Sequence, residues 1–396
     1  MNHSKNQQEF LQAVLDGKNV FLTGKAGTGK SHITKVAMTE LQKQGKNVMA
    51  LAPTGIAANN IGGATLHSTF SLSPFGILTF ETCNFMKDTK RKMLSKIDTL
   101  FIDEVSMLRP DILDGLNWTL IKNGCKTLEE MQIILIGDMK QLGIVADDNM
   151  VSVMLKTYGG CSFEKADIYP RLNIVNIELD EVLRQNDPEF ISALNSIRDG
   201  GKNEYFRQFV SDIQKGIILA PHNATVQKYN INGFHSIEGN QYTFEASIEG
   251  NLKATDFNLE PTIKVKDGCK IMYLANSKNN NLINGTLGIF RVSDAGTEDE
   301  RYFIEVGEEQ FSLEQKKFTK KEYILNRKTG KLDLQDVGSI IQIPIKLAYA
   351  LTIHKSQGLT FDEVTIDLTL PCFAKGQMYV ALSRVRTPSG LSIITK

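Results

Sequence analysis

The octapeptide Gly24–Ser31, GKAGTGKS, has the residue types and spacing of a phosphate-binding loop. It follows an apolar run at Val20–Leu22 and precedes a helix-forming stretch at Ile33–Gln42. Glycines let consecutive backbone N–H groups surround phosphate oxygens, and the N-terminus of the next helix adds positive potential. Lys30 and Ser31 carry side chains that reach the terminal phosphates and magnesium. The loop predicts nucleoside triphosphate binding, with ATP and Mg²⁺ as cofactors; a simple glycine-rich turn is the alternative.

Two neighbouring carboxylates follow another apolar run. Asp103 and Glu104 come directly after Leu100–Ile102, and ligands of open α/β sheets bind where such strands end. We expect Asp103 to hold magnesium through its hydration shell. We expect Glu104 to polarise the water that attacks the γ-phosphate. The pair therefore predicts hydrolysis of the bound triphosphate.

Three more polar residues fit this chemistry. Gln141 follows the apolar run Ile133–Ile136, and its amide can donate to a phosphate oxygen while it accepts from water, although a generic polar loop residue fits the pattern equally well. Arg184 and Arg384 each border an element of a second α/β region. Two guanidinium groups facing the phosphate loop would neutralise transition-state charge and make closure of two lobes depend on ATP. Either arginine alone also fits an ordinary surface position.

The alternation of strand-like and helical patterns predicts an α/β protein with two parallel-sheet lobes. Strands of the first lobe are expected at Val20–Leu22, Val48–Leu51, Leu100–Ile102 and Ile133–Ile136, and those of the second at Ile174–Leu179, Ile217–Leu219 and Val364–Leu368. Short β-like pieces with Asn, Gly and Asp between them predict a small β-rich domain inserted into the second lobe. The expected ranges are 1–172 for the first lobe with an insertion at 65–95, 173–234 and 342–396 for the second lobe, and 235–341 for the β-rich domain.

The amino-acid composition and charge of the chain exclude several classes of protein. The 396 residues include 41% hydrophobic and 23% charged residues, which is typical of a globular protein, and no apolar run approaches the roughly 20 residues that span a bilayer. With a polar start as well, we expect a cytoplasmic, nucleoid-associated protein without membrane contact. The 5 scattered cysteines suggest neither a disulfide framework nor a zinc site. Because 45 basic residues balance 45 acidic ones, any nucleic-acid contact must come from a local surface.

Taken in order, the motifs of the chain resemble those of superfamily 1B DNA helicases, and within them the Pif (petite integration frequency) family of bacterial type. The matching segments are Gln7, GKAGTGKS, APTGIAA, TLHSTF, IDEVSM, GDMKQL, the stretch from Leu183 to Gly200, LINGTLG, LTIHKSQG and YVALSRV. One departure stands beside Gln141: Gly143 occupies a place where the family commonly has proline, which would loosen the backbone there.

The resemblance implies two RecA-like lobes, an SH3-like β domain at 235–341 and a role for each matched residue. Gln7, or its neighbour Gln8, would read the adenine, and Gln141, Arg184 and Arg384 would couple hydrolysis to lobe movement. The remaining nucleotide contacts would be Gly27, Thr28, Gly29, Lys30, Ser31 and Gly358, with Ser31 and Asp103 at the metal. The implied DNA-facing residues are Pro53, Thr54, Thr65, His67, Ser68, His354, Lys355 and Thr360. Phe75 is either a wedge at the duplex junction or an apolar tip that packs on its own hairpin.

The implied activity is an ATP-dependent helicase that moves 5′ to 3′ along single-stranded DNA and separates tailed or forked duplexes. Similar helicases also open folded guanine quadruplexes. Because both arginines belong to one chain, a monomer would suffice. The alternatives are a nucleotide-switched protein that binds single strands without productive stepping, and an ATPase that remodels proteins. RNA as the track also stays open, because backbone contacts rarely exclude it.

Overall fold

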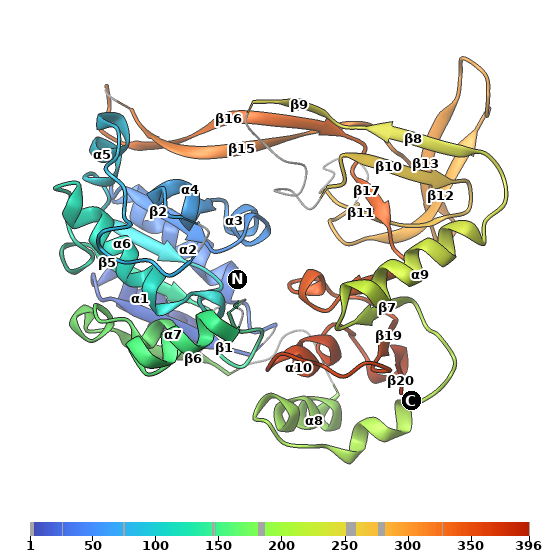
Figure 1. Cartoon of the computed structure of the whole chain (residues 1–396), viewed down its shortest axis with the longest axis horizontal. Helices are drawn as coiled ribbons and strands as arrows, with labels where there is room; N and C mark the ends of the chain where they lie inside the picture. Colours follow the sequence, from blue (N-terminus) through green and yellow to red (C-terminus); the bar gives the residue numbers. More distant parts are fainter. Residues whose placement is uncertain are drawn as a thin grey trace. The chain divides into compact units, whose positions relative to one another are not determined.

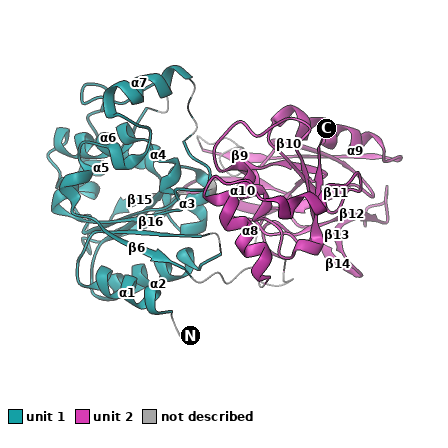
Figure 2. Ribbon diagram, turned by 90° about the horizontal axis from the view of Figure 1, so that it is seen from below, with its two compact units in different colours: residues 1–185, 321–336 teal, residues 186–320, 337–396 magenta. Residues whose placement is uncertain are grey.

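The computed structural model describes residues 4–25, 27–73, 76–144, 146, 148–180, 187–250, 259–275, 282–326 and 328–395. Two compact units make up the chain (Figure 2). Unit 1 comprises Met1–Gln185 and Lys321–Asp336, and unit 2 comprises Asn186–Lys320 and Val337–Lys396. The chain therefore leaves unit 1, returns to it for a short segment, and leaves it again.

Unit 1 is built on a six-stranded sheet with the order β3-β2-β4-β5-β1-β6, and all of its pairings are parallel (Figure 1). The strands are β1 (Val20–Gly24), β2 (Val48–Ala52), β3 (Ala64–Thr65), β4 (Thr99–Ile102), β5 (Gln132–Ile136) and β6 (Val175–Leu179). The helices are α1 (Lys5–Leu15), α2 (Lys30–Lys43), α3 (Gly55–Ile61), α4 (Leu66–Phe70), α5 (Asp88–Leu94), α6 (Pro110–Lys122) and α7 (Asp148–Tyr158). The four strands expected for this lobe are confirmed.

Helices cover both faces of this sheet, and the strands alternate between two cores. In β1, Val20 and Leu22 pack with α1 and α2, whereas Phe21 packs in the other core with residues of α4, α5 and α6. The same alternation holds in β4, where Phe101 packs in the core that contains residues of α1 and α2. Burial on both faces explains why these strands read as continuous apolar runs in the sequence.

The prediction that Ile174–Leu179 opens the second sheet is wrong. Strand β6 lies at the edge of the first sheet, where Val175 to Leu179 pair in parallel with Val20 to Gly24 of β1. Asn19 supports this arrangement, because its backbone carbonyl accepts from Val175 N at 2.9 Å and its Nδ2 donates to Leu172 O at 2.5 Å. An apolar pattern predicts a strand but not the strand with which it pairs. Because β6 pairs with β1, the first lobe extends past residue 172.

The segment at 65–95, expected as an insertion, contributes to the core of unit 1. Phe70 of α4 and Leu94 of α5 are fully buried in the core that also holds Phe21. Between the two helices, Leu72 and Leu78 are buried in the same core. The segment is therefore fixed to the sheet at several points.

Unit 2 contains a four-stranded sheet with the order β18-β7-β19-β20, again with parallel pairing. Its strands are β7 (Ile217–Ala220), β18 (Ala350–Thr352), β19 (Val364–Asp367) and β20 (Leu391–Ile394), and its helices are α8 (Pro188–Arg198), α9 (Asn223–His235) and α10 (Gln377–Leu382). The expected strands at 217–219 and 364–368 are confirmed.

Antiparallel sheets occupy the chain between α9 and β18, as predicted for a β-rich insertion. A five-stranded sheet has the order β14-β13-β12-β11-β17, β10 pairs with β8, and β15 pairs with β16, which in turn pairs with β9. The bounds are β8 (Gln241–Glu245), β9 (Ser247–Glu249), β10 (Thr262–Lys266), β11 (Lys270–Tyr273), β12 (Leu287–Ser293), β13 (Arg301–Val306), β14 (Glu309–Ser312), β15 (Lys316–Leu325), β16 (Leu332–Gln342) and β17 (Ile345–Leu347). Phe290 and Ile304 are fully buried in the core of this module.

The tip of the β15–β16 hairpin belongs to unit 1, although we expected 235–341 to form one domain. Tyr323 Oη accepts a hydrogen bond from Ala50 N in β2 at 2.9 Å, and Asn47 Oδ1 accepts from Leu332 N at 3.2 Å. Leu325 packs against the core of unit 1 together with Tyr323 and Leu332. Burial raises the pKa of the Tyr323 hydroxyl, so it stays protonated at neutral pH.

Replacement of Tyr323 by Phe should lower the stability of unit 1. The change leaves the Ala50 N–H buried without its acceptor, which costs about 1–3 kcal/mol. Chemical denaturation followed by far-UV circular dichroism measures the loss. Ile324→Ala, at an exposed neighbouring position, should change stability by less than about 0.5 kcal/mol. Equal effects of the two changes would contradict the importance of this hydrogen bond.

Candidate functional site

Parallel pairing brings the predicted nucleotide residues of unit 1 to one edge of its sheet. β1 runs into the loop Gly24–Ser31, β4 into Asp103 and Glu104, and β5 into the turn that holds Gln141. β5 lies between β1 and β4 in the strand order, so the carboxyl ends of these strands are neighbours. The three segments that we selected separately from the sequence therefore meet at one place.

The loop has a backbone that glycine alone accommodates well. Gly29, the residue before α2, has φ +84°, and Gly27 has φ +82°, both in the left-handed region. At Gly24, a Cβ atom would lie 2.6 Å from the carbonyl oxygen of Leu179. The loop and the start of α2 thus direct backbone N–H groups toward the space in front of the strand ends, which is the arrangement that binds phosphate.

Polar side chains hold the loop in this shape. Lys30 Nζ donates to Gly24 O at 2.7 Å and to Lys25 O at 3.0 Å. The hydroxyl of Thr28, which is buried, also donates to Lys25 O, at 2.9 Å. Gln7 Nε2 donates to Thr28 O at 3.4 Å. Gln7 therefore lies beside the loop, and its capping box with Ser4 fixes the start of α1.

Asp103 is held at the end of β4 by its backbone and its carboxylate. Its N–H donates to Leu51 O at 2.9 Å, and its Oδ1 accepts from Glu104 N at 2.9 Å. Burial raises the pKa of the Asp103 carboxyl, while the positive charges of Lys30 and Lys35 oppose this change. Glu104 adopts φ +53°, a left-handed conformation that is uncommon for residues other than glycine. Such local strain is often found at functional sites.

Gln141 lies in a turn closed by Asp138. Asp138 O accepts from Gln141 N at 3.0 Å, and Asp138 Oδ2 accepts from Gln141 Nε2 at 3.4 Å. Asp138 is 1% exposed, so the turn is anchored in the protein interior. Nothing lies within 4 Å of the position that a Cβ of Gly143 would take, so this site has room for a larger residue. No motif in the sequence indicated the anchoring role of Asp138, which lies two residues after the end of β5.

The predicted DNA-facing residues of unit 1 lie at the same edge, beyond β4. Pro53 and Thr54 follow β2, and Thr65 ends β3, which pairs with β2. Thr54 and Thr65 are helix caps: Thr54 accepts from Ala57 N, and Thr65 accepts from Ser68 N. The Thr65 hydroxyl also donates to Ser68 Oγ at 3.0 Å. β4, which carries the acidic pair, thus separates the nucleotide half of the edge from these hydroxyl groups.

His67 is half-buried in this second half of the edge. Burial lowers the pKa of its imidazole, and the nearby Arg109 lowers it further, whereas Asp111 opposes them. The ring is therefore neutral at pH 7 and above. A neutral imidazole contributes hydrogen bonds rather than charge to a phosphate contact.

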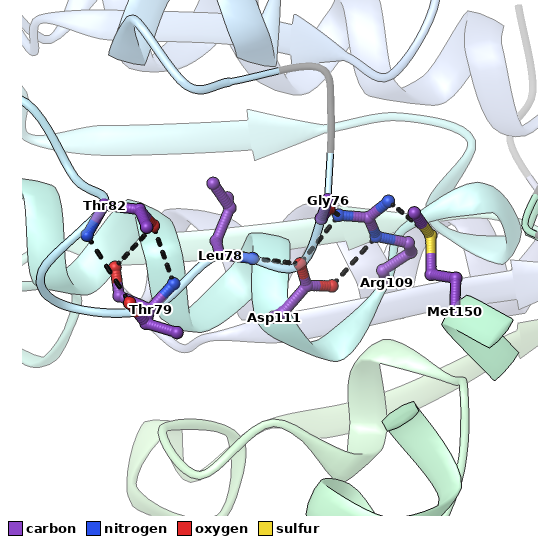
Figure 3. A network of polar contacts seen from close by, with 7 residues as sticks. All are labelled: Gly76, Leu78, Thr79, Thr82, Arg109, Asp111 and Met150. Atoms are coloured by element: carbon purple, nitrogen blue, oxygen red, sulfur yellow. Dashed lines mark hydrogen bonds and ion pairs between the residues drawn. The ribbon is translucent and has the colours of Figure 1, made fainter. Parts of the chain in front are cut away.

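A buried ion pair connects this region with the segment at 76–86. Arg109 Nη2 and Asp111 Oδ2 lie 2.7 Å apart, and their side chains are 9% and 0% exposed. Arg109 also donates to Gly76 O, and Asp111 accepts from Leu78 N, both at 2.9 Å (Figure 3). The ion pair therefore anchors the segment that leads away from residues 74–75, and Phe75 itself lies outside the described residues. The sequence contains no motif that would have pointed to this pair.

In unit 2, the segment LTIHKSQG begins within β18, at Leu351, and continues beyond the end of the strand. His354 is half-buried, and burial lowers the pKa of its imidazole, whereas Lys355 is exposed. Gly358 has φ +81°, and Thr360 lies two residues further on. The ring of His354 stacks on Phe373, with 5.9 Å between the ring centroids.

Two residues of unit 2 that no sequence motif indicated lie beside His354. Gln377 is fully buried; its Nε2 lies 3.5 Å from His354 Nδ1, and its Oε1 accepts from Phe373 N at 2.9 Å. Phe373 is 65% exposed beside the imidazole. An exposed aromatic ring of this kind can stack on a nucleic-acid base.

Arg384 is only 1% exposed and is bound within unit 2. Its guanidinium donates to Val380 O at 2.8 Å, to Leu359 O at 3.1 Å and to Ser383 Oγ at 2.7 Å. It thereby links α10 to the loop that follows LTIHKSQG. The other predicted arginine, Arg184, lies outside the described residues.

These features define a P-loop nucleoside triphosphatase with two RecA-like sheets. Residues 2–221 match the model of the PIF1-like helicase family. The chain belongs to this family and is an ATP-dependent DNA helicase by class. It is 29% identical to the ATP-dependent DNA helicase Pif1 of Campylobacter jejuni over 97% of this chain and 90% of that protein. It is 31% identical to human ATP-dependent DNA helicase PIF1 over 99% of this chain, but it spans only 60% of that protein.

Solved structures of Pif1 helicases are also similar to this chain. Bacteroides sp Pif1 in complex with ADP-AlF4 matches 100% of this chain and 95% of its own, with 30% identity and a TM-score of 0.85. Bacteroides Pif1 bound to ssDNA matches 99% of this chain and 92% of its own, with 32% identity and a TM-score of 0.69.

In the part of the chain that the structure describes, no helix has the length and apolar character needed to cross a membrane.

Replacement of His67 by Ala should weaken binding of single-stranded DNA by a neutral hydrogen bond, about 0.5–1.5 kcal/mol. Because the imidazole pKa is lowered below 6.5, the ring carries no charge at pH 7.5, and the loss should be equal at pH 7.0 and 8.5. Fluorescence anisotropy with labelled oligothymidylate at several NaCl concentrations measures both effects. The slope of log affinity against log salt should match that of the wild type. A smaller slope for the variant would show that His67 binds as a cation.

Proposed function

We propose that this helicase moves 5′ to 3′ along single-stranded DNA and thereby separates tailed and forked duplexes. The observation that carries the proposal is the single sheet edge of unit 1. The phosphate loop and the acidic pair lie on one side of it, and Pro53, Thr54 and Thr65 follow the neighbouring strands. A change at the nucleotide can therefore reach the DNA-facing residues through β4 and β2, which are directly hydrogen-bonded.

The residues at this edge divide the chemistry of hydrolysis. Gly27, Thr28, Gly29, Lys30 and Ser31 bind the phosphates, and Gln7 or Gln8 reads the adenine. The Ser31 hydroxyl and the Asp103 carboxylate are oxygen donors of the kind that Mg²⁺ prefers, and the ion would supply charge neutralisation at the β- and γ-phosphates. Among the described residues, no group of three His, Cys, Asp or Glu could hold a metal ion by itself. Glu104 orients the attacking water.

Coupling between hydrolysis and movement is assigned to three residues. Gln141 senses the γ-phosphate, and Arg184 and Arg384 neutralise charge in the transition state, with Gly358 near the nucleotide. Because Arg384 holds the carbonyl of Leu359, any change in its hydrogen bonds would be passed to the segment that carries His354, Lys355 and Thr360. These three, with His67 and Ser68, grip the strand, and Phe75 acts as the wedge. Since both arginines are supplied in cis, a monomer is sufficient.

Replacement of Lys30 by Ala should abolish ATP turnover and unwinding, because the loop loses the cation that binds the terminal phosphates. Phosphate release with and without single-stranded DNA measures turnover, and strand separation of duplexes with a 5′ or a 3′ tail measures direction. Wild-type protein should show DNA-stimulated turnover and open only the 5′-tailed duplex. Lys46→Ala, at an exposed lysine beyond α2, serves as the control and should behave as wild type. Unwinding of a tailed duplex by Lys30→Ala would refute the assignment.

Replacement of Arg384 by Ala should slow hydrolysis about 10³-fold or more while ATP affinity changes little, because the guanidinium acts on charge that develops in the transition state. Single-turnover hydrolysis and binding of a fluorescent ATP analogue separate the two quantities. Arg184→Ala should have the same effect. Arg386→Ala, which removes only an exposed ion pair with Asp362, is the matched control. Unchanged hydrolysis in both arginine variants would show that neither group reaches the phosphate.

A nucleotide-switched protein that binds single strands without stepping is the alternative that Gly143 favours, because a looser loop couples less strongly. Catalytic unwinding of the 5′-tailed duplex excludes this alternative. Forked DNA and guanine quadruplexes belong to the same proposal, and an RNA strand in place of DNA tests the track. One similar structure describes DNA unwinding at forked dsDNA by two coordinating Pif1 helicases, so the stoichiometry on DNA is to be measured on this chain as well.

A further inference from the structure

Large apolar side chains face solvent on one part of unit 1. Phe85 is 78% exposed and Phe80 is 41% exposed, in the segment 79–86 between the buried Leu78 and α5. Ile121, in the last turn of α6, is 47% exposed. Single exposed apolar residues are common on protein surfaces, whereas a group of them marks a contact surface. These three side chains are such a group, because α6 joins them.

Lys122 of α6 holds the two aromatic rings. Its Nζ lies 5.3 Å from the ring centroid of Phe80 and 5.3 Å from that of Phe85. The same ammonium donates to Phe80 O at 3.2 Å and to Glu81 O at 3.1 Å. A cation near the face of an aromatic ring is attracted to it. The rings are therefore fixed around one charge, while most of the surface of Phe85 stays open to solvent.

The backbone of the segment is also fixed. Asn123 Oδ1 accepts from Met86 N at 2.7 Å, and Asn123 Nδ2 donates to Asn84 O at 3.1 Å. Thr79 N donates to Thr82 Oγ1 at 2.9 Å and closes a turn at the start of the segment (Figure 3). The exposed rings thus stand on a backbone that is held at both ends. A surface that is ordered in advance loses little entropy when a partner binds.

This surface lies at the opposite edge of the sheet from the nucleotide residues. α6 begins at Pro110, after the carboxyl end of β4, and ends at Lys122, before the amino end of β5. Because β4 and β5 are parallel neighbours, the helix between them returns the chain to the amino-terminal edge. An ion pair of 3.5 Å between Lys126 and Asp98, the residue before β4, agrees with this position. ATP chemistry and the predicted DNA-facing residues therefore do not explain the exposed rings.

Basic side chains surround the rings. Residues 79–96 contain five lysines and arginines against two acidic residues, Glu81 and Asp88, in a chain of zero formal net charge. The basic helix α5 lies beside the end of α6, since Cys125 Sγ donates to Arg91 O at 3.5 Å. An apolar centre with a charged rim is the usual anatomy of a protein interface. A positive rim attracts a partner of negative charge.

We propose that Phe80, Phe85 and Ile121, together with the basic residues of α5, form a docking surface for an acidic segment of a partner protein that carries large apolar side chains. The apolar centre comprises few side chains, so it fits a short segment rather than a permanent subunit interface. A nucleic acid would also be attracted by the positive charge. The position at the edge opposite the predicted DNA-facing residues favours a protein partner. The inference goes beyond the proposed function and does not depend on it.

Selection of random peptides displayed on phage against the immobilised full chain tests the proposal. The enriched sequences should be acidic and should contain Phe, Trp, Leu or Ile. Binding of labelled synthetic copies is then measured by fluorescence anisotropy. Phe85→Ser should weaken it about tenfold or more, because the central aromatic side chain of an interface carries much of the binding energy.

Two further variants complete the comparison. Lys92→Glu, at an exposed position of α5, should also weaken peptide binding, because it reverses a charge of the rim. Ile213→Ser removes an apolar side chain that is 69% exposed in unit 2, and it serves as the matched control with wild-type affinity. Thermal unfolding midpoints of Phe85→Ser and Lys92→Glu should equal that of the wild type, since both positions are exposed.

Several outcomes would overturn the inference. These are a selection that enriches no peptide, one that enriches peptides without acidic excess, and peptide binding that neither Phe85→Ser nor Lys92→Glu weakens. Loss of oligothymidylate binding in Phe85→Ser would also overturn it, because the surface would then belong to nucleic-acid binding. Wild-type protein that binds the acidic peptides but unwinds no duplex would refute the proposed function and leave this inference standing.

Discussion

Parallel hydrogen bonding from β3 through β2, β4 and β5 to β1 is the constraint on which the rest of the structure depends. It brings the carboxyl ends of these parallel strands to one edge of the sheet. Residues that are far apart in the sequence therefore become neighbours at this edge. The same pairing requires that both faces of the sheet be covered, which explains the two separate cores. A polar edge between two apolar layers is the result. The loop of Gly24–Ser31, the acidic pair and the hydroxyl groups that we predict to face DNA are found there.

Buried charges in this protein are treated in three different ways. Arg109 and Asp111 form a buried ion pair. Replacement of either residue would leave the charge of the other uncompensated. Arg384 instead spreads its donors over backbone carbonyls and one hydroxyl, so its charge fixes the loop after LTIHKSQG. Lys346 on β17 is 6% exposed, and burial together with repulsion by Lys355 lowers its pKa to about 8. The first two groups hold neighbouring loops in place.

Local chemistry explains what could be predicted from the sequence. The phosphate loop, Asp103 and the strands beside them were predictable because each depends on a few consecutive residues. β6 was placed in the wrong sheet because an apolar run does not specify its neighbour, and the hairpin tip with Tyr323 was missed for the same reason. Asp111, Gln377 and Lys346 have no motif, since their environments are made by segments distant in the sequence. The roles of all the predicted site residues stay predictions, and Phe75 and Arg184 lie outside the described residues.

Unit 1 is built from two segments that are far apart in the chain, and this has a consequence for folding during synthesis. During synthesis, residues 1–185 leave the ribosome well before 321–336, so the flank of β2 that Tyr323 and Leu332 will cover stays open to solvent in the meantime. Apolar surface that is exposed in this interval is a target for chaperones and for aggregation. A recombinant fragment that ends near residue 185 would keep this defect permanently. Production of unit 1 alone would therefore require the hairpin tip as well, for example joined to the fragment through a short linker.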